Sequence, residues 1–248
     1  MAKQTGITDR LYWHGTDISG DVGAIQSIST NVALLPLTAI NSETEERTQG
    51  QSSGAINFVS WFNDELSLPI LDDLPSTDVI LLYARGVSIG SPCFALSAKQ
   101  VNHDPQRGQD GSLTLPVDAQ GSGVAGEYGR LLTAGQHTFA DSNATEPAGV
   151  VESQTTYGGV GYLQVESLGS GSPTYILEDS DDTTTGSDGN WATLLTFDGG
   201  TAPFGERKTV TGTVEQGVRC GTPTGTYTNA VVVAGFRRGS EGDREDLS

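Results

Sequence analysis

Short segments rich in apolar residues, separated by turn-forming residues, run along most of the chain. The first series comprises residues 21–28, 33–40, 55–63, 79–87, 93–101 and 113–119. Gly, Ser, Asn or Asp lie at or close to most of their ends. Runs of this length, bounded by turn residues and rich in β-branched and aromatic positions, predict β-strands.

Residues 113–119 show the clearest alternation. Every second residue is apolar, and Thr114, Pro116 and Asp118 lie between them. This period of two predicts a strand with one buried face and one wet face. Because proline lacks a backbone N–H, Pro116 predicts a sheet edge or a bulge at that point.

One segment follows a helical period. Leu66, Ile70, Leu71 and Leu74 recur at helical spacing, and residues 75–78 (PSTD) end the pattern. The sequence therefore predicts one short helix within 66–74. Residues 1–16 are mostly polar and predict an N-terminal arm that docks through Tyr12 and Trp13.

A second strand series follows a change in composition. Residues 140–156 are small and polar, which predicts a domain boundary near Gly149. Strands are expected beyond it at 161–168, 174–178, 191–197, 207–214 and 226–237. The expected fold is all-β: a first domain over 1–149 with the helix, a C-terminal β-sandwich over 150–240, and a charged tail over 241–248.

Charge narrows the classes of function. The chain has 31 acidic and 13 basic residues and a net charge of −18. Proteins that wrap nucleic acid need clustered Lys and Arg, so that class is excluded. The acidity would repel DNA at short range, but it is also consistent with high solubility or with a high-salt habitat, and the sequence does not decide among the three. No apolar run of membrane-spanning length and no secretion signal are present, so we expect a soluble chain made in a cytoplasm.

The sequence offers no catalytic grouping. His14, His103 and His137 are isolated, and Cys93 and Cys220 lack the spacing of a zinc site. Nucleophile-elbow, P-loop and dinucleotide motifs are absent. We therefore expect no enzyme activity and no cofactor.

Residues 178–190, EDSDDTTTGSDGN, contain the only metal candidates. Asp179, Asp181, Asp182 and Asp188 could supply oxygen ligands for calcium, although their spacing is not that of an EF-hand. A solvated acidic loop is the favoured interpretation.

Trp191 follows this acidic loop and is expected to pack on Tyr162 or Tyr175. Aromatic side chains on a β-sandwich can also stack on sugars, although core packing is the more common role.

The N-terminal two-thirds of the chain resembles the major tail (tail tube) proteins of long-tailed phages and archaeal tailed viruses. Three segments carry the resemblance: residues 35–63, 74–98 and 107–135. In the first, the matching positions are Thr38, Glu46, Arg47, Gly50, Gly54, Ile56, Phe58, Trp61 and Phe62. Residues 167–197 resemble a C-terminal domain added in one branch of these proteins.

The resemblance implies a virion structural protein that forms hexameric rings, stacked into a tail tube through which DNA passes. The expected partners are further copies of the chain and other tail proteins, without specific DNA binding and without a membrane. The polar loop at 41–54 would join stacked rings through Glu43, Glu45, Glu46 and Arg47. Asp118 is the expected carboxylate of the lumen, and Lys99 a local exception.

A carbohydrate-binding or host-adhesion protein of the virion, at the tail tip or as a decoration, is the alternative function. It would use the aromatic residues of the C-terminal domain.

Overall fold

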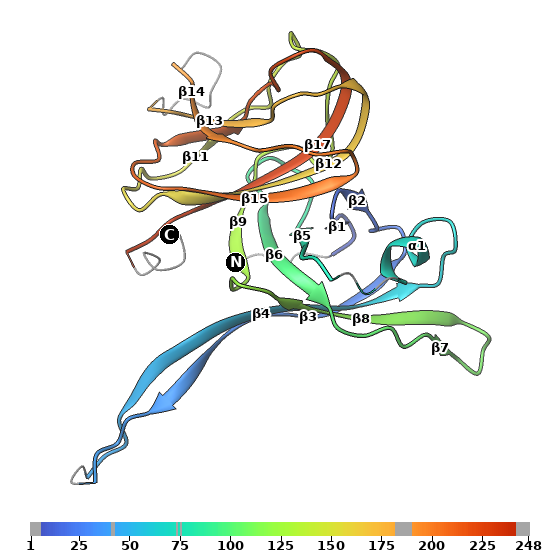
Figure 1. Ribbon diagram of the computed structural model, residues 1–248, viewed down its shortest axis with the longest axis vertical. Coiled ribbons are helices and arrows are strands. Elements are labelled where there is room, and N and C mark those ends of the chain that lie inside the picture. The colour runs from blue at the N-terminus through green and yellow to red at the C-terminus, as the bar shows by residue number, and fades with distance from the viewer. Residues whose placement is uncertain (1–5, 41–42, 73, 75, 182–189, 242–248) are drawn as a thin grey trace. The chain divides into compact units, whose positions relative to one another are not determined.

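The computed structural model describes residues 6–40, 43–72, 74, 76–181 and 190–241, and it confirms an all-β chain with one short helix (Figure 1). The chain divides into two compact units. Unit 1 consists of Met1–Gly20, Val79–Ala95 and Glu127–Ser248, and unit 2 of Asp21–Asp78 and Leu96–Gly126. Within the described residues, none of the helical structure is long and apolar enough to span a bilayer.

Unit 1 contains two antiparallel sheets. Its strands are β1 (Arg10–Trp13), β2 (Thr16–Asp17), β5 (Val79–Ala84), β9 (Glu127–Leu131), β10 (His137–Phe139), β11 (Val150–Val151), β12 (Gly159–Gly171), β13 (Ile176–Ser180), β14 (Ala192–Thr196), β15 (Phe204–Val210), β16 (Gly217–Cys220) and β17 (Tyr227–Arg238). Strand β6 (Pro92–Gln100) begins in unit 1 and ends in unit 2. The larger sheet has the order β15-β12-β17-β9-β6-β5-β1-β2, with β10 also paired to β17, and the smaller sheet has the order β11-β16-β13-β14.

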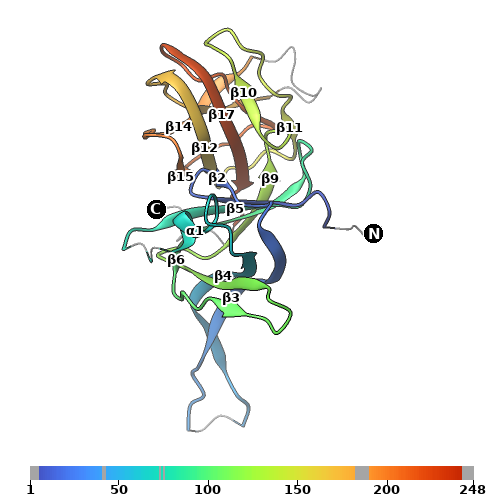
Figure 2. The ribbon, with the colours of Figure 1, turned by 90° about the vertical axis from the view of Figure 1, so that its right-hand side faces the viewer.

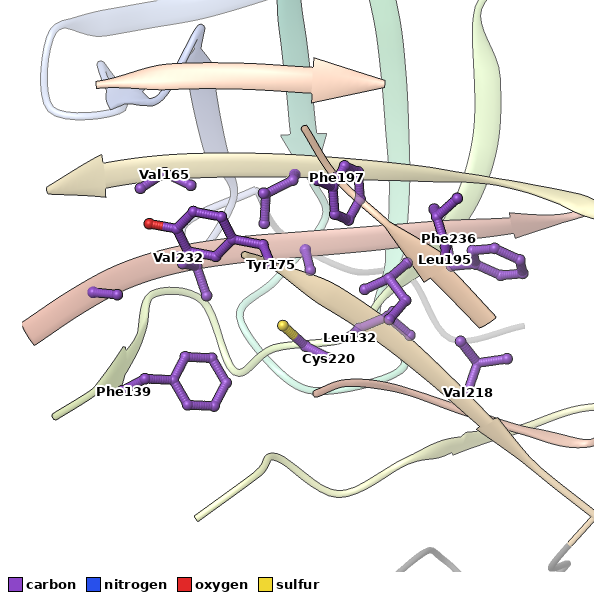
Figure 3. Packing of buried hydrophobic residues seen from close by; sticks show 14 of the residues in the cluster. Leu132, Phe139, Val165, Tyr175, Leu195, Phe197, Val218, Cys220, Val232 and Phe236 are labelled. Carbon is purple, nitrogen blue, oxygen red and sulfur yellow. The ribbon is translucent and has the colours of Figure 1, made fainter. Parts of the chain in front are cut away.

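The two sheets of unit 1 enclose a sandwich core. Val165 and Val232 come from the larger sheet, and Val218 from the smaller one (Figure 3). Leu163 of β12 and Leu177 of β13 belong to the same core. Leu132 and Phe139, which precede residue 149, belong to the same core.

The first seven residues of strand β12, 159–165, are buried on both faces. Leu163 and Val165 point into the sandwich core, whereas Val160 and Tyr162 belong to a second cluster with Tyr12 and Leu82. Neighbouring residues of a strand point to opposite faces, so the even positions before Val165 face this second cluster. After the register shift between Val165 and Ser167, Leu168 packs on the sandwich core instead. This double burial explains the continuous apolar run that made the strand predictable from sequence.

Unit 2 contains the remaining strands of the larger sheet, which join it through the pairing of β8 with β6, and the only described helix. It contains β3 (Val22–Pro36), β4 (Arg47–Trp61), β7 (Gln106–Arg107), β8 (Leu113–Gly121), the end of β6 and α1 (Leu68–Leu71). β4 pairs with β3 on one side and with β8 on the other. Ile56, Phe58 and Val117 are buried on one face, and Leu71 of the helix is fully buried.

The interruption predicted at Pro116 is confirmed. On the side away from β4, β8 pairs with β7 at Leu113 and Thr114 and with β6 only from Ala119 onward. Between these pairings, the Asn102 side chain donates to Pro116 O (3.1 Å) and accepts from Asp118 N (2.7 Å). A side chain thus takes the place of a strand where proline has no N–H to offer.

Four expectations differ from the structure. Residues 21–28 and 33–40 form the single strand β3, which ends at Pro36. The predicted loop at 41–54 is shorter, because residues 47–54 belong to β4. Residues 10–13 do dock through the buried Tyr12 and Trp13, but as a regular strand, β1, that pairs with β5.

The fourth difference concerns the domain boundary. Residues on both sides of Gly149 lie in unit 1, because β9 and β10 pair with β17. The compact units therefore do not follow the expected division into 1–149 and 150–240.

Candidate self-assembly surfaces

The far half of the β3–β4 hairpin has no second layer over it. β8 pairs with β4 only from Ala55 to Trp61, so residues 47–53 pair with β3 alone (Figure 2). At Gly54 an added Cβ would lie 2.4 Å from Gly126 N, so only glycine fits where the hairpin leaves the sheet. Five large aliphatic side chains are exposed along this half: Val32, Leu34, Leu35, Leu37 and Ile40. Apolar side chains gathered on one exposed segment are typical of a contact surface.

The end of the hairpin carries the four residues expected to join rings. Glu43, Glu45, Glu46 and Arg47 are all exposed, and Arg47 pairs with Glu45. The Glu46 N–H donates to Thr38 Oγ1 (3.0 Å). The structure thus brings the predicted residues to one place, while their contacts with another copy stay a prediction.

Asp118 lies on the wet face of the unit 2 sheet, as the alternation predicted. It stands opposite Asn57, which stands opposite Ser27 on β3. In the amide orientation that satisfies both neighbours, Asn57 donates to Asp118 Oδ1 (2.5 Å) and accepts from Ser27 Oγ (3.2 Å). Asp118 is half-buried in this polar row. Whether the row faces a lumen stays a prediction.

Lys99, the expected exception, is partly neutralised by its neighbours. Its Nζ lies 2.7 Å from Asp78 Oδ1 and donates to Ser76 O (2.7 Å). The hydrogen bond from Lys99 holds the pKa of Asp78 below its usual value. The local positive charge on this surface is therefore offset within unit 2.

The calcium candidates are only partly within the described residues. Asp179 is buried and accepts a hydrogen bond from Glu215 N (2.9 Å), and burial raises the pKa of its carboxyl. Asp181 is exposed, whereas Asp182 and Asp188 lie outside the described residues. Among the residues that are described, no three His, Cys, Asp or Glu side chains group as metal ligands.

Two histidines, His14 and His137, and both cysteines have structural surroundings. His14 Nδ1 lies 3.5 Å from Ile80 N, and His137 packs edge-on against Phe139. Burial raises the pKa of the Cys93 and Cys220 thiols to about 12, so both stay protonated at neutral pH.

His103 and Trp191 are also engaged in contacts within the protein. The His103 ring lies 3.3 Å from Leu71 O at the end of the helix. Trp191 is covered by Arg219, whose guanidinium lies 4.3 Å from the ring centre, so this face of the indole is taken by the protein.

A surface pocket of about 400 Å³ in unit 1 carries unusual positive charge. We call it the arginine pocket, and its main lining residues are Tyr128, Arg130, Glu152, Phe236, Arg237 and Arg238. Arg130 Nε lies 2.9 Å from Glu152 Oε1, and Arg238 Nε lies 3.6 Å from Glu152 Oε2. Arg238 also donates to Val214 O (3.2 Å) and Gln216 O (2.6 Å), which fixes its side chain.

Beside the pocket, a buried carboxylate ties four strands together. Glu127 on β9 is 4% exposed; Arg207 Nε (3.0 Å) and Arg237 Nη1 (3.1 Å) donate to its oxygens. The Tyr162 hydroxyl donates to the same carboxylate. These residues come from β9, β12, β15 and β17. These residues are far apart along the chain, so no local pattern marks them, and only the Arg237–Arg238 doublet gives a local signal.

Comparison with known proteins gives no family. No family model and no curated protein matches the chain. Among solved structures, the chain is similar to proteins in the virion of a native gene transfer agent particle (13% identity, TM-score 0.39) and in the tail of the empty particle (15% identity, TM-score 0.38). Both matches cover 51% of this chain and 98% of the other.

A further similarity is to the SPP1 Dit protein, described as part of a hub adsorption apparatus in phages that infect Gram-positive bacteria. It covers 92% of this chain and 99% of the other, at 10% identity and a TM-score of 0.34. At such TM-scores none of these similarities carries an argument about function.

Proposed function

We propose that this chain is a structural subunit of a virus tail, whose copies assemble into stacked hexameric rings that form a tube for the passage of DNA. The subunit is made in the host cytoplasm, contacts other tail proteins and becomes part of the virion. The resemblance of residues 35–63 to tail-tube proteins supports this proposal. The observation that carries it is the exposed half of the β3–β4 hairpin.

That hairpin is difficult to explain in a protein that works alone. Its exposed aliphatic side chains would be hydrated in a monomer, at a cost that burial against another copy would remove. Two such side chains, if fully buried at a contact, contribute up to about 3 to 6 kcal/mol. A structural role between copies therefore accounts for a feature that a catalytic or small-molecule-binding role would not need.

Electron microscopy of the purified protein tests assembly directly. We expect hollow tubes or stacked rings from the native chain. The variant Leu34→Ser/Leu37→Ser should fold but remain unassembled, whereas Ile7→Ser, which changes an exposed aliphatic residue of unit 1, should assemble normally. Compact monomers or trimers from the native chain would contradict the proposal and favour the adhesion alternative.

The proposed tube also requires a particular charge on its inner wall. A tube for DNA must hold the duplex without binding it, and a ring of Lys or Arg would bind phosphates strongly at low salt. The row around Asp118 is the proposed inner wall, so the lumen should be net negative and the protein should show no affinity for duplex DNA. A gel-shift assay at low salt and a map of the tube check both points, and a positive inner wall would refute the charge argument.

A further inference from the structure

We propose that the arginine pocket of one copy receives the acidic end of the β3–β4 hairpin of a second copy. This inference rests on the proposed function only in that copies of the chain associate. It names both surfaces of one contact: a pocket built from β9 and β17 in unit 1, and residues 43–47 at the end of the hairpin in unit 2.

The pocket is an exception in a strongly acidic protein. The chain has 13 basic residues against 31 acidic ones. Three of its arginines nevertheless line the pocket, against one acidic lining residue, Glu152: Arg130, Arg237 and Arg238. The lining itself therefore has an excess of two positive charges, while Glu127, Asp179 and Glu215 act on these arginines from outside it. A carboxylate-bearing segment is the ligand that such a site recognises best.

The pocket can be entered from solvent. The Arg130 side chain is 44% exposed, and Tyr128 is 57% exposed. Arg237 and Arg238 are held by Glu127 and by two backbone carbonyl groups, so their guanidinium groups are fixed before any ligand arrives. Little side-chain freedom is then lost on binding, which favours a specific contact.

The hairpin end fits this site in charge, in chemistry and in reach. Glu43, Glu45 and Glu46 are exposed against one arginine, Arg47. Beside them the aliphatic Leu37 is 61% exposed and can cover the rings of Tyr128 and Phe236. Residues 47–54 extend past the last pairing with β8, and at about 3.4 Å per residue they carry the acidic end about 25 Å beyond it.

Charge reversal tests the contact. Glu45→Arg/Glu46→Arg makes the hairpin end basic, and Arg130→Glu cancels the positive excess of the pocket lining and puts a second carboxylate beside Glu152 at its exposed side. Each variant alone should weaken self-association, measured by sedimentation, at least about tenfold at low salt, because like charges then face each other. The two changes combined in one chain should restore association to near the native value. Exposed pairs of this kind are screened, so the native association should weaken as salt rises.

Two variants control for the charge change itself. Arg85→Glu changes an exposed arginine of unit 1 outside the pocket, and Asp64→Arg/Glu65→Arg changes two exposed acids of unit 2 outside the hairpin. Both should associate like the native chain, and thermal melts should show that every variant is folded. Failure of the combined variant to regain association, with both single variants folded, would overturn the proposed contact.

Disulfide trapping separates this contact from tube formation. A Thr44→Cys chain mixed with a Tyr128→Cys chain should form a cross-linked heterodimer under mild oxidation, since both native cysteines are buried. Tubes without the heterodimer would refute the pocket contact and leave the proposed function standing. The heterodimer without tubes would support the contact and refute the ring assembly.

Discussion

Replacement of Glu127 by glutamine tests what holds the middle of unit 1 together. The Glu127 carboxylate is 4% exposed and is contacted by guanidinium groups of Arg207 and Arg237, whose side chains are 14% and 22% exposed. Glutamine has the same size but no charge, and its NH₂ group cannot accept a hydrogen bond from an arginine. The variant therefore leaves two largely buried cations without their counter-ion and creates no cavity.

The size of the effect follows from this burial. Removing one partner of a buried ion pair costs about 3 to 5 kcal/mol, whereas a native domain is stable by about 5 to 15 kcal/mol in all. With a urea m value of about 2 kcal/mol per molar, a loss of 3 kcal/mol lowers the unfolding midpoint by about 1.5 M.

Urea unfolding followed by tryptophan fluorescence measures this change. In a Trp61→Phe background the remaining tryptophans, Trp13 and Trp191, both belong to unit 1, so the signal reports that unit. Asp198→Asn is the control, because it also removes one carboxylate charge of unit 1, but from a side chain that is 81% exposed, and such surface pairs with Lys contribute little to stability. Equal midpoints for the two variants would show that the buried network does not stabilise unit 1.

Three further predictions concern two tyrosine hydroxyls, one half-buried carboxyl and the polar segment 140–156. Tyr175→Phe should be neutral or stabilising, because the buried Tyr175 hydroxyl has no hydrogen-bond partner among the described residues. Tyr227→Phe removes a hydrogen bond to Asp141 O (2.7 Å), so it should cost about 1 kcal/mol of stability. Thermal melts measure both changes. Burial raises the pKa of the Glu166 carboxyl from 4.5 to about 7. As pH rises through that window, the native chain should therefore lose stability relative to Glu166→Gln. Below the window, where the carboxyl is protonated in both the folded and the unfolded chain, this difference in stability should vanish. Proteolytic cleavage within residues 140–156 should give fragments that elute together from a sizing column until they are denatured, because β10 pairs with β17 across the cut. Release of a folded C-terminal fragment would instead support the boundary expected near Gly149.

The sequence predicted the strands that have a buried face. β8 alternates between apolar and polar residues and β12 is apolar on both faces, so each carries a clear pattern. β9 and β16 are short, and their burial depends on partners that lie far away in the chain, so no local pattern marks them. The division into units was hidden for the same reason, since β1 and β5 pair across residues that belong to unit 2.

The far half of the β3–β4 hairpin contains a strand segment that the sequence did not predict. Residues 47–53, RTQGQSS, have no apolar position, and a strand with no face to bury has no period to detect. The acidic residues at its end were identified from the sequence because they are neighbours along the chain. The arginine pocket was not, because Arg130, Glu152 and Arg237 meet only after β9 and β17 have paired.

Strand β3 forms the free edge of the unit 2 sheet, and among the described residues it pairs with β4 alone. Its register shifts at three places: between Val22 and Ala24, between Ile25 and Ser27, and between Val32 and Leu34. Such irregularities bend and twist a strand, so its outer amide and carbonyl groups do not form a long, straight template. We therefore expect this edge to resist edge-to-edge growth into amyloid-like fibrils, although exposed aliphatic side chains lie along the same hairpin.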